Sequence, residues 1–211
     1  MRHTAVPFVL LCAVLAAPAG AIMIDNFRDG RRATEAVEQG SIGTHTVVET
    51  QMTSILGGTR RLSIEATKLD VAGADAVSAA VVRTPGRLTY DSSVGGDGRF
   101  KLAYDGGGSG LQANLSTTRG IALKLDAADL SALPCPVTLT ITDASGGSAI
   151  QTQNVTQPTR SILRFMFKTM SGVDLSQVRS IELALDPGAA GDINVQWIRT
   201  FGARRSPRAA Q

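Results

Sequence analysis

The segment Val137-Thr138-Leu139-Thr140-Ile141-Thr142 alternates apolar with hydroxyl-bearing side chains. Successive side chains of a β-strand point to opposite faces, so this period of two places the apolar residues on one face and the threonines on the other. Strands of this kind are typical of antiparallel sheets with one buried and one solvated face. The segment therefore predicts a half-buried antiparallel strand.

The same alternation recurs on both sides of this segment. Its apolar positions are Leu62 and Ile64; Phe100, Leu102 and Tyr104; Ile121, Leu123 and Leu125; Ile181, Leu183 and Leu185; and Ile193, Val195 and Trp197. The residues between them are mostly Thr, Ser, Lys, Glu, Ala or Asn. Each run is therefore expected to form a strand that has one face in the core.

Clusters of Gly, Asp and Pro separate these runs, as at residues 95–98, 105–110, 143–147 and 186–188. Such residues supply the backbone angles that tight turns require. Their short spacing predicts an all-β fold, a two-sheet antiparallel β-sandwich of jelly-roll type with about ten to twelve strands. Residues 144–148 are expected to form a hairpin turn. A helical period is confined to residues 174–178, where Asp174 is placed to cap a single turn.

The chain begins with a basic start, Arg2 and His3, followed by an apolar run over residues 6–17 and small residues that end at Ala21. This order is typical of a secretory signal peptide. The apolar run is about a dozen residues long, whereas a membrane-spanning helix needs roughly 20. We expect residues 1–21 to be a signal peptide that is removed on export, and the protein to be secreted or periplasmic with no membrane span. Residues 22–202 are expected to form a single β-sandwich domain, and residues 203–211 a basic disordered tail.

Charge and cysteine content exclude some classes of protein. The formal net charge is +3 and the acidic residues are spread along the chain, which does not indicate a nucleic-acid-binding surface. Arginines gather at residues 28–32, at residues 60–61 and in the tail, where they would attract anionic polysaccharide or lipid headgroups if they are not simply a solvated surface. Once the signal peptide is removed, Cys135 has no cysteine partner within the chain, so disulfides do not hold this fold together.

Three short motifs carry a resemblance to a known family. They are Ile24-Asp25-Asn26-Phe27 followed by Asp29-Gly30, the segment 174–178 followed by Ile181-Glu182-Leu183, and Asp192-Ile193-Asn194-Val195. Together they resemble exported bacterial β-sandwich proteins with the galactose-binding-domain-like fold, a group that includes carbohydrate-binding modules. The resemblance implies a partner that is a polysaccharide or a cell-envelope glycan, although fold alone does not specify a function.

The resemblance also implies a metal site. In sandwiches of this kind a structural calcium ion commonly joins the first and last strands, and calcium prefers the oxygen ligands that aspartate supplies. By that resemblance, Asp25 and Asp192 are the candidate calcium ligands.

The sequence contains no recognisable catalytic constellation. His45 is the only histidine after the signal peptide, and its strand-like surroundings favour a surface residue over a general base. Most aspartates lie in glycine-rich turns, where local hydrogen bonding explains them better than catalysis does. We therefore expect an exported non-catalytic domain that binds extracellular carbohydrate or cell-envelope material. The alternatives are an enzyme that acts on polysaccharide and a purely structural envelope or matrix protein.

The candidate ligand-binding residues are Tyr90, Tyr104, Asp105 and Trp197. Aromatic rings stack on sugars, and Tyr90, Tyr104 and Trp197 are the only rings expected to be able to serve as a platform, although each would also suit the edge of the core. Asp105 opens the glycine-rich stretch 105–110, in which glycines either let the backbone approach a ligand closely or provide flexibility.

Overall fold

The computed structural model describes residues 21–29, 34–37, 42–70, 75–129, 133–157 and 159–203. The expected signal peptide, apart from Ala21, and the expected tail beyond Ala203 lie outside these residues. Within them, the regular structure consists of β-strands and three short 3-10 turns. No helix in the described ranges has the length and apolar character needed to cross a membrane.

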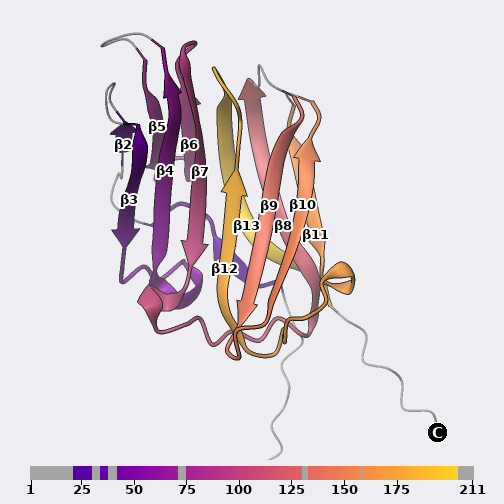
Figure 1. Ribbon diagram of the computed structural model, residues 1–211. Coiled ribbons are helices and arrows are strands. Elements are labelled where there is room, and N and C mark those ends of the chain that lie inside the picture. The colour runs from indigo at the N-terminus through magenta and orange to yellow at the C-terminus, as the bar shows by residue number, and fades with distance from the viewer. Residues whose placement is uncertain are drawn as a thin grey trace, which may run out of the picture.

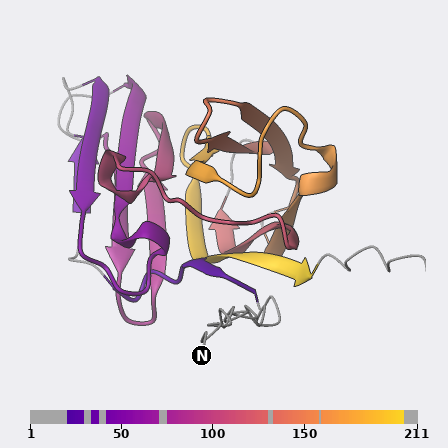
Figure 2. The same ribbon diagram turned by 90° about the horizontal axis from the view of Figure 1, so that it is seen from below.

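The strands form two antiparallel sheets, as the alternation predicted. The first sheet has the order β11 (Ser161–Met166), β8 (Thr118–Asp129), β13 (Asp192–Ala203), β6 (Arg87–Ser92), β5 (Val77–Val82) and β2 (Thr34–Val37). The three-residue strand β1 (Met23–Asp25) pairs with β13 at the side of this order, so the sheet is seven-stranded. Figure 2 shows β1 lying beside β13.

The second sheet is six-stranded. Its order is β10 (Ser148–Val155), β9 (Cys135–Asp143), β12 (Val178–Leu185), β7 (Gly96–Tyr104), β4 (Arg60–Leu69) and β3 (Gly43–Glu49). Figure 1 looks onto this sheet, with the seven-stranded sheet behind it. The two main orders together hold twelve strands in the described part of the chain, in agreement with the predicted ten to twelve, and β1 is an additional short strand.

The connections follow the jelly-roll pattern. The hairpins β3–β4, β5–β6 and β9–β10 stay within one sheet, whereas the connections from β6 to β7, β7 to β8 and β8 to β9 pass from one sheet to the other. The predicted hairpin at residues 144–148 is confirmed, because β9 and β10 pair from Thr142 and Ser148 onward. Because the chain passes repeatedly from one sheet to the other, strands that are distant in sequence become neighbours in a sheet.

The core lies between the two sheets, and β9 shows how the sequence builds it. Val137, Leu139 and Ile141 are fully buried, while the threonines between them are half-buried on the outer face. The other alternating runs behave in the same way, with Trp197 as the exception. The register of β13 shifts between Val195 and Trp197. The core position therefore passes to Ile198, which is fully buried, and Trp197 turns outward.

The expected helical turn at residues 174–178 is wrong. The segment is a hydrogen-bonded turn, in which the Gln177 amide donates to the Asp174 carbonyl at 3.2 Å. The Asp174 carboxylate accepts from the Ser176 amide at 2.9 Å and the Ser176 hydroxyl at 2.7 Å. This local bonding is an alternative to the helical hydrogen-bond pattern, and it ends where β12 begins at Val178.

Candidate functional site

The two tyrosines predicted as ligand platforms lie in the core. Tyr90 is 1% exposed and stacks on Phe100 with ring centroids 5.2 Å apart. Tyr104 is fully buried, and its hydroxyl donates to Asp25 Oδ2 at 2.9 Å. Burial raises the pKa of both phenols well above their usual value. Neither ring is available to stack on a sugar, so their predicted role is corrected to packing.

Asp105 organises a turn. Its Oδ1 accepts from the amides of Gly107 at 3.0 Å and Gly108 at 3.3 Å, within the 3-10 turn η2 (Gly106–Gly108). Its Oδ2 forms an ion pair with Arg61 at 3.2 Å. All three glycines of η2 have positive φ, between 60° and 93°, which side chains rarely tolerate. The glycine-rich sequence is thus explained by its backbone conformation.

The structure does not bring Asp25 and Asp192 together. Asp25 is fully buried, and its carboxylate accepts from the Phe27 amide at 2.8 Å, from Arg60 at 2.8 Å and from Tyr104. Asp25 lies opposite Ile198, whereas Asp192 starts β13 six residues earlier. At about 3.3 Å per strand residue, they are on the order of 20 Å apart. The expectation that both ligate one calcium ion is therefore corrected, and the described residues contain no cluster of three or more metal-binding side chains.

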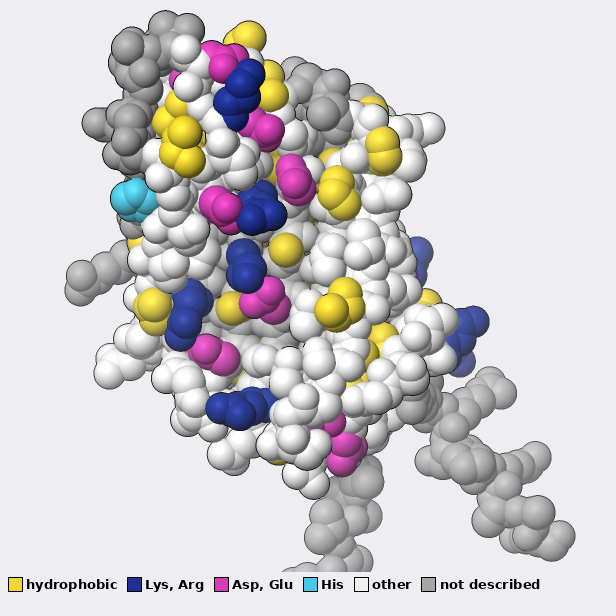
Figure 3. Space-filling view, viewed as in Figure 1, with side chains coloured by type: hydrophobic (Ala, Val, Ile, Leu, Met, Phe, Trp, Pro, Cys, Tyr) yellow, Lys and Arg dark blue, Asp and Glu magenta, His cyan; other side chains and the backbone are white. Residues whose placement is uncertain are grey.

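A side-chain arrangement that can bind a ligand lies instead on the outer face of the six-stranded sheet. The polar residues of the alternating runs point outward there, from four neighbouring strands. They line a hollow of about 400 Å³ whose walls include Thr44, Ser63, Glu65, Arg99, Lys101 and Glu182. Figure 3 shows Lys and Arg side chains interspersed with Asp and Glu along the middle of this face. We call this site the six-stranded hollow.

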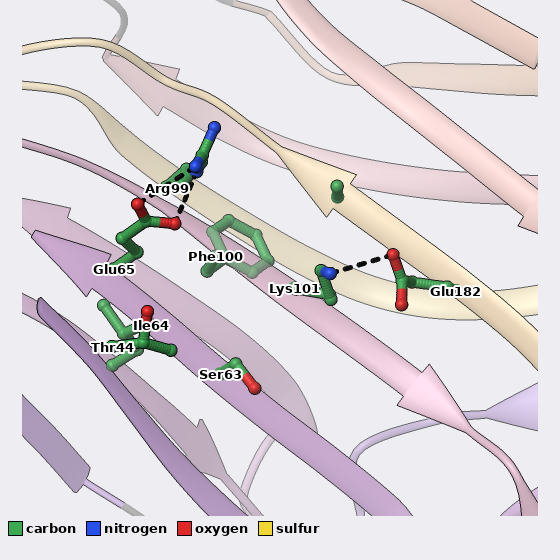
Figure 4. A pocket seen from close by; sticks show the side chains of 9 residues that line it. Thr44, Ser63, Ile64, Glu65, Arg99, Phe100, Lys101 and Glu182 are labelled. Atoms are coloured by element: carbon green, nitrogen blue, oxygen red, sulfur yellow. Dashed lines mark hydrogen bonds and ion pairs between the residues drawn. The ribbon is translucent and has the colours of Figure 1, made fainter. Parts of the chain in front are cut away.

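Two ion pairs organise the six-stranded hollow. Arg99 on β7 donates two hydrogen bonds to Glu65 on β4, at 2.7 and 3.0 Å. Lys101, two residues further along β7, lies 3.0 Å from Glu182 on β12. Figure 4 shows the two pairs with Phe100 between them at the floor. The four charged side chains are between 36% and 55% exposed, so they can also contact a ligand.

Hydroxyl groups extend this polar surface sideways. The Thr46 and Ser63 hydroxyls are 2.9 Å apart on β3 and β4, and the Thr138 and Thr152 hydroxyls are 2.9 Å apart on β9 and β10. Because a hydroxyl can both donate and accept, each pair keeps hydrogen-bonding capacity for a ligand. The outer face therefore presents donors and acceptors side by side on rigid strands.

The two glutamates of the hollow are attached to backbone positions that are further apart than the carboxyl groups of a glycosidase. Glu65 lies opposite Arg99, and Glu182 lies opposite Ala103 four residues further along β7, with one strand between them. From strand spacing and rise, their backbones are on the order of 15 Å apart. Glycosidase carboxyl groups are about 5 to 9.5 Å apart, and the general acid has a raised pKa. Here the hydrogen bonds from Arg99 lower the pKa of Glu65.

Trp197 is the one predicted ring that reaches the surface of the described chain. It lies on the seven-stranded sheet, away from the six-stranded hollow, with the Arg199 guanidinium 4.2 Å from its ring centroid. His45 is exposed on β3, and Cys135 is fully buried at the start of β9. Neither of these two residues lines the six-stranded hollow.

Sequence reasoning missed the residues of the six-stranded hollow. Glu65, Arg99, Lys101 and Glu182 occupy the polar positions in or beside the alternating runs, which the sequence indicates only as outward-facing. The sequence offered one indication, because charged residues rather than threonine or serine fill outward-facing positions in or beside three of the runs. It did not indicate which of these runs are neighbours in the sheet.

Comparisons with known proteins give fold-level likenesses. No protein-family model and no curated protein matches the chain. Among solved structures, a family 11 carbohydrate-binding module of Clostridium thermocellum, in complex with a β-1,3-1,4-mixed-linked tetrasaccharide, is 14% identical with a TM-score of 0.44, covering 89% of this chain and 98% of that one. The module TmCBM61, in complex with β-1,4-galactotriose, is 10% identical with a TM-score of 0.34, covering 80% and 87%.

The likeness extends to part of a larger enzyme. The MgGH51 α-L-arabinofuranosidase is 15% identical with a TM-score of 0.42, covering 86% of this chain and 26% of that one. These likenesses concern the fold alone. The class of protein, a two-sheet β-sandwich, follows from the strand pairing itself.

Proposed function

We propose that this protein binds an extended polysaccharide on the outer face of the six-stranded sheet and does not cleave it. The observation that carries the proposal is the six-stranded hollow, in which each cation stands beside a carboxylate: Arg99 with Glu65, and Lys101 with Glu182. A sugar hydroxyl both donates and accepts, so neighbouring donors and acceptors suit a neutral glycan. The rows of threonine and serine hydroxyls support a ligand that extends across several strands.

The lining residues that the structure describes include no exposed aromatic ring, and this determines how binding would work. Phe100 is 1% exposed and forms part of the floor, so stacking area is small. Affinity would come from hydrogen bonds made by side chains that rigid strands hold in position, and we expect a favourable binding enthalpy. Tetrasaccharide binding by the family 11 module agrees with this proposal but does not specify the sugar.

The test starts with a glycan array probed with the purified protein and continues with calorimetry on the best ligand. Arg99→Ala and Glu182→Ala should each lower affinity about tenfold, since a hydrogen bond to a charged group contributes about 1.5 kcal/mol or more. Arg164→Ala is the matched control, because Arg164 is exposed on β11 of the other sheet. The proposal is contradicted if the array gives no ligand, or if the Arg164 variant loses as much affinity as the Arg99 variant.

A further inference from the structure

A second hollow lies on the seven-stranded sheet, around Trp197. It has a volume of about 360 Å³, and its lining comes from β1, the segment after it, the β5–β6 turn and β13. The lining residues that matter are Arg28, Arg87 and Trp197. We call this site the Trp197 hollow, and none of its described lining residues also lines the six-stranded hollow.

The charge of the Trp197 hollow differs from that of the six-stranded hollow. Arg28 and Arg87 line it, Arg199 lies over the ring, and no carboxylate is among the lining residues that the structure describes. Arg28 and Arg199 are exposed, and Arg87 is half-buried with its Nε lacking a hydrogen-bond acceptor in the described protein. Guanidinium groups only donate, so this set requires a ligand that accepts.

The contact between Arg199 and Trp197 indicates which kind of ligand the Trp197 hollow would bind. The Arg199 guanidinium lies 4.2 Å from the indole centroid and occupies a ring face on which a neutral pyranose would stack. A stacked guanidinium keeps its N–H groups in its own plane, where they can form paired hydrogen bonds to a carboxylate. The contact with the indole restricts the position of the Arg199 guanidinium.

We propose that the Trp197 hollow binds the carboxylate groups of an acidic polysaccharide, a chain of uronate sugars. The carboxylates accept hydrogen bonds from Arg28, from Arg87, whose Nε has no acceptor among the described residues, and from Arg199 over the Trp197 ring. The polar edge of the sugar meets Asn26 and Gln196 in the same lining. The concave shape favours a sugar unit over a flat lipid surface, because Arg28 and Arg87 line a recess and Arg199 lies over the ring of Trp197, which also lines it. This site is separate from the one in the proposed function, so the protein has a neutral-glycan face and an acidic-glycan face.

The chain contains a single tryptophan, so its fluorescence reports on this site directly. Titration with polygalacturonate should change the Trp197 emission, and the change should weaken at high salt because the attraction is between charges. Fully methyl-esterified polygalacturonate, which has the same backbone without the charge, should give no change. Arg99→Ala should leave the titration unaltered, which separates a failure of this site from a failure of the six-stranded hollow.

Variants then locate the binding. Arg28→Gln, Arg87→Gln and Arg199→Gln should each lower affinity for polygalacturonate about tenfold by calorimetry. Arg164→Gln makes the same charge change elsewhere on the same sheet and should have less than about a twofold effect. Arg28 and Arg199 are exposed, so their variants should fold even if replacement of the half-buried Arg87 disrupts the structure. The test then rests on those two variants. An equal loss in the Arg164 variant, or an emission change with phosphatidylserine vesicles but not with polygalacturonate, would overturn the proposal.

Discussion

Arg60 Nη1 lies 2.8 Å from Asp25 Oδ2, and both side chains are 0% exposed. The pair joins β4 of the six-stranded sheet to β1 of the seven-stranded sheet, through the interior. Arg60 also donates to Glu49 and to the Asp29 carbonyl, and Tyr104 donates to Asp25. Burial by itself lowers the pKa of Arg60, but Asp25 and the neighbouring acidic groups raise it, so the guanidinium stays charged. A buried charge cluster therefore ties the two sheets together.

Breaking this cluster should be strongly destabilising. Arg60→Met leaves the buried carboxylates of Asp25 and Glu49 without the cation that compensates them, which typically costs about 3–5 kcal/mol. Arg99→Met is the matched control, because the Arg99–Glu65 pair is on the surface, where ion pairs contribute about 0–1 kcal/mol. Urea denaturation followed by circular dichroism measures both losses. Similar losses in the two variants would contradict a special role for burial.

Acid should weaken the turn between β9 and β10. The Asp143 carboxylate accepts from the amides of Asp174, Ser145 and Gly147 at 2.8–2.9 Å. The Asp174 amide, the Ser145 hydroxyl and the other donors lower the pKa of Asp143 to about 2. The folded-state pKa is below the unfolded value of about 3.9, so the stabilisation is present above about pH 4 and is lost as the pH falls toward 2.

The variant Asp143→Asn tests this dependence. It should be less stable than the wild type at pH 7, and the difference should shrink as the pH approaches 2, where about half of the wild-type Asp143 carboxyl groups are protonated and uncharged. Asp91→Asn, at an exposed position on β6, should leave the acid limb of the stability curve unchanged. A difference that is the same at pH 7 and pH 2 would refute the assignment.

The Cys135 thiol should be chemically inert in the folded protein. It is fully buried, and burial, followed by the charge of Asp186, raises its pKa to about 12. Because the thiolate is the reactive form, labelling with a thiol reagent should occur only on unfolding. Peptide mapping after labelling distinguishes Cys135 from Cys12. Complete modification of Cys135 within seconds in native buffer would show that the thiol is accessible.

Calcium should not stabilise this protein through Asp25. Both carboxylate oxygens of Asp25 already accept hydrogen bonds, and Asp192 is too distant to complete a site. Melting temperatures in calcium and in chelator should coincide, because only a ligand that binds the folded state raises them. A rise of several degrees in calcium that Asp192→Ala abolishes would restore the metal site.

Export should leave Ile22 as the first residue. This prediction rests on the short apolar run and the small residues that end at Ala21. Intact-mass spectrometry of the protein recovered from the periplasm or the medium measures the N-terminus directly. A mass that includes Met1 would show that the segment is retained.

The local pattern predicted the sheets well and the candidate sites poorly. Val137, Leu139 and Ile141 are buried as expected, since alternation depends only on the direction of successive side chains along one strand. The same rule predicted Trp197 as an extension of Ile193 and Val195, but the register shift after Val195 turned it outward. A bulge depends on pairing with a neighbouring strand, so the run itself carries no sign of it.

The sequence alone determined the fold class, the antiparallel pairing and which face of most strands is polar, because these follow from residues within a few positions of one another. Only the tertiary structure decided that Asp25 meets Arg60, 35 residues away, and that Glu65, Arg99, Lys101 and Glu182 share one hollow. Both arrangements depend on which strands lie side by side. The alternation of apolar and polar residues along one strand does not indicate which strands are its neighbours. Burial then determines whether a carboxylate compensates an internal charge, as Asp25 does, or is partly exposed beside a surface cation, as Glu65 is.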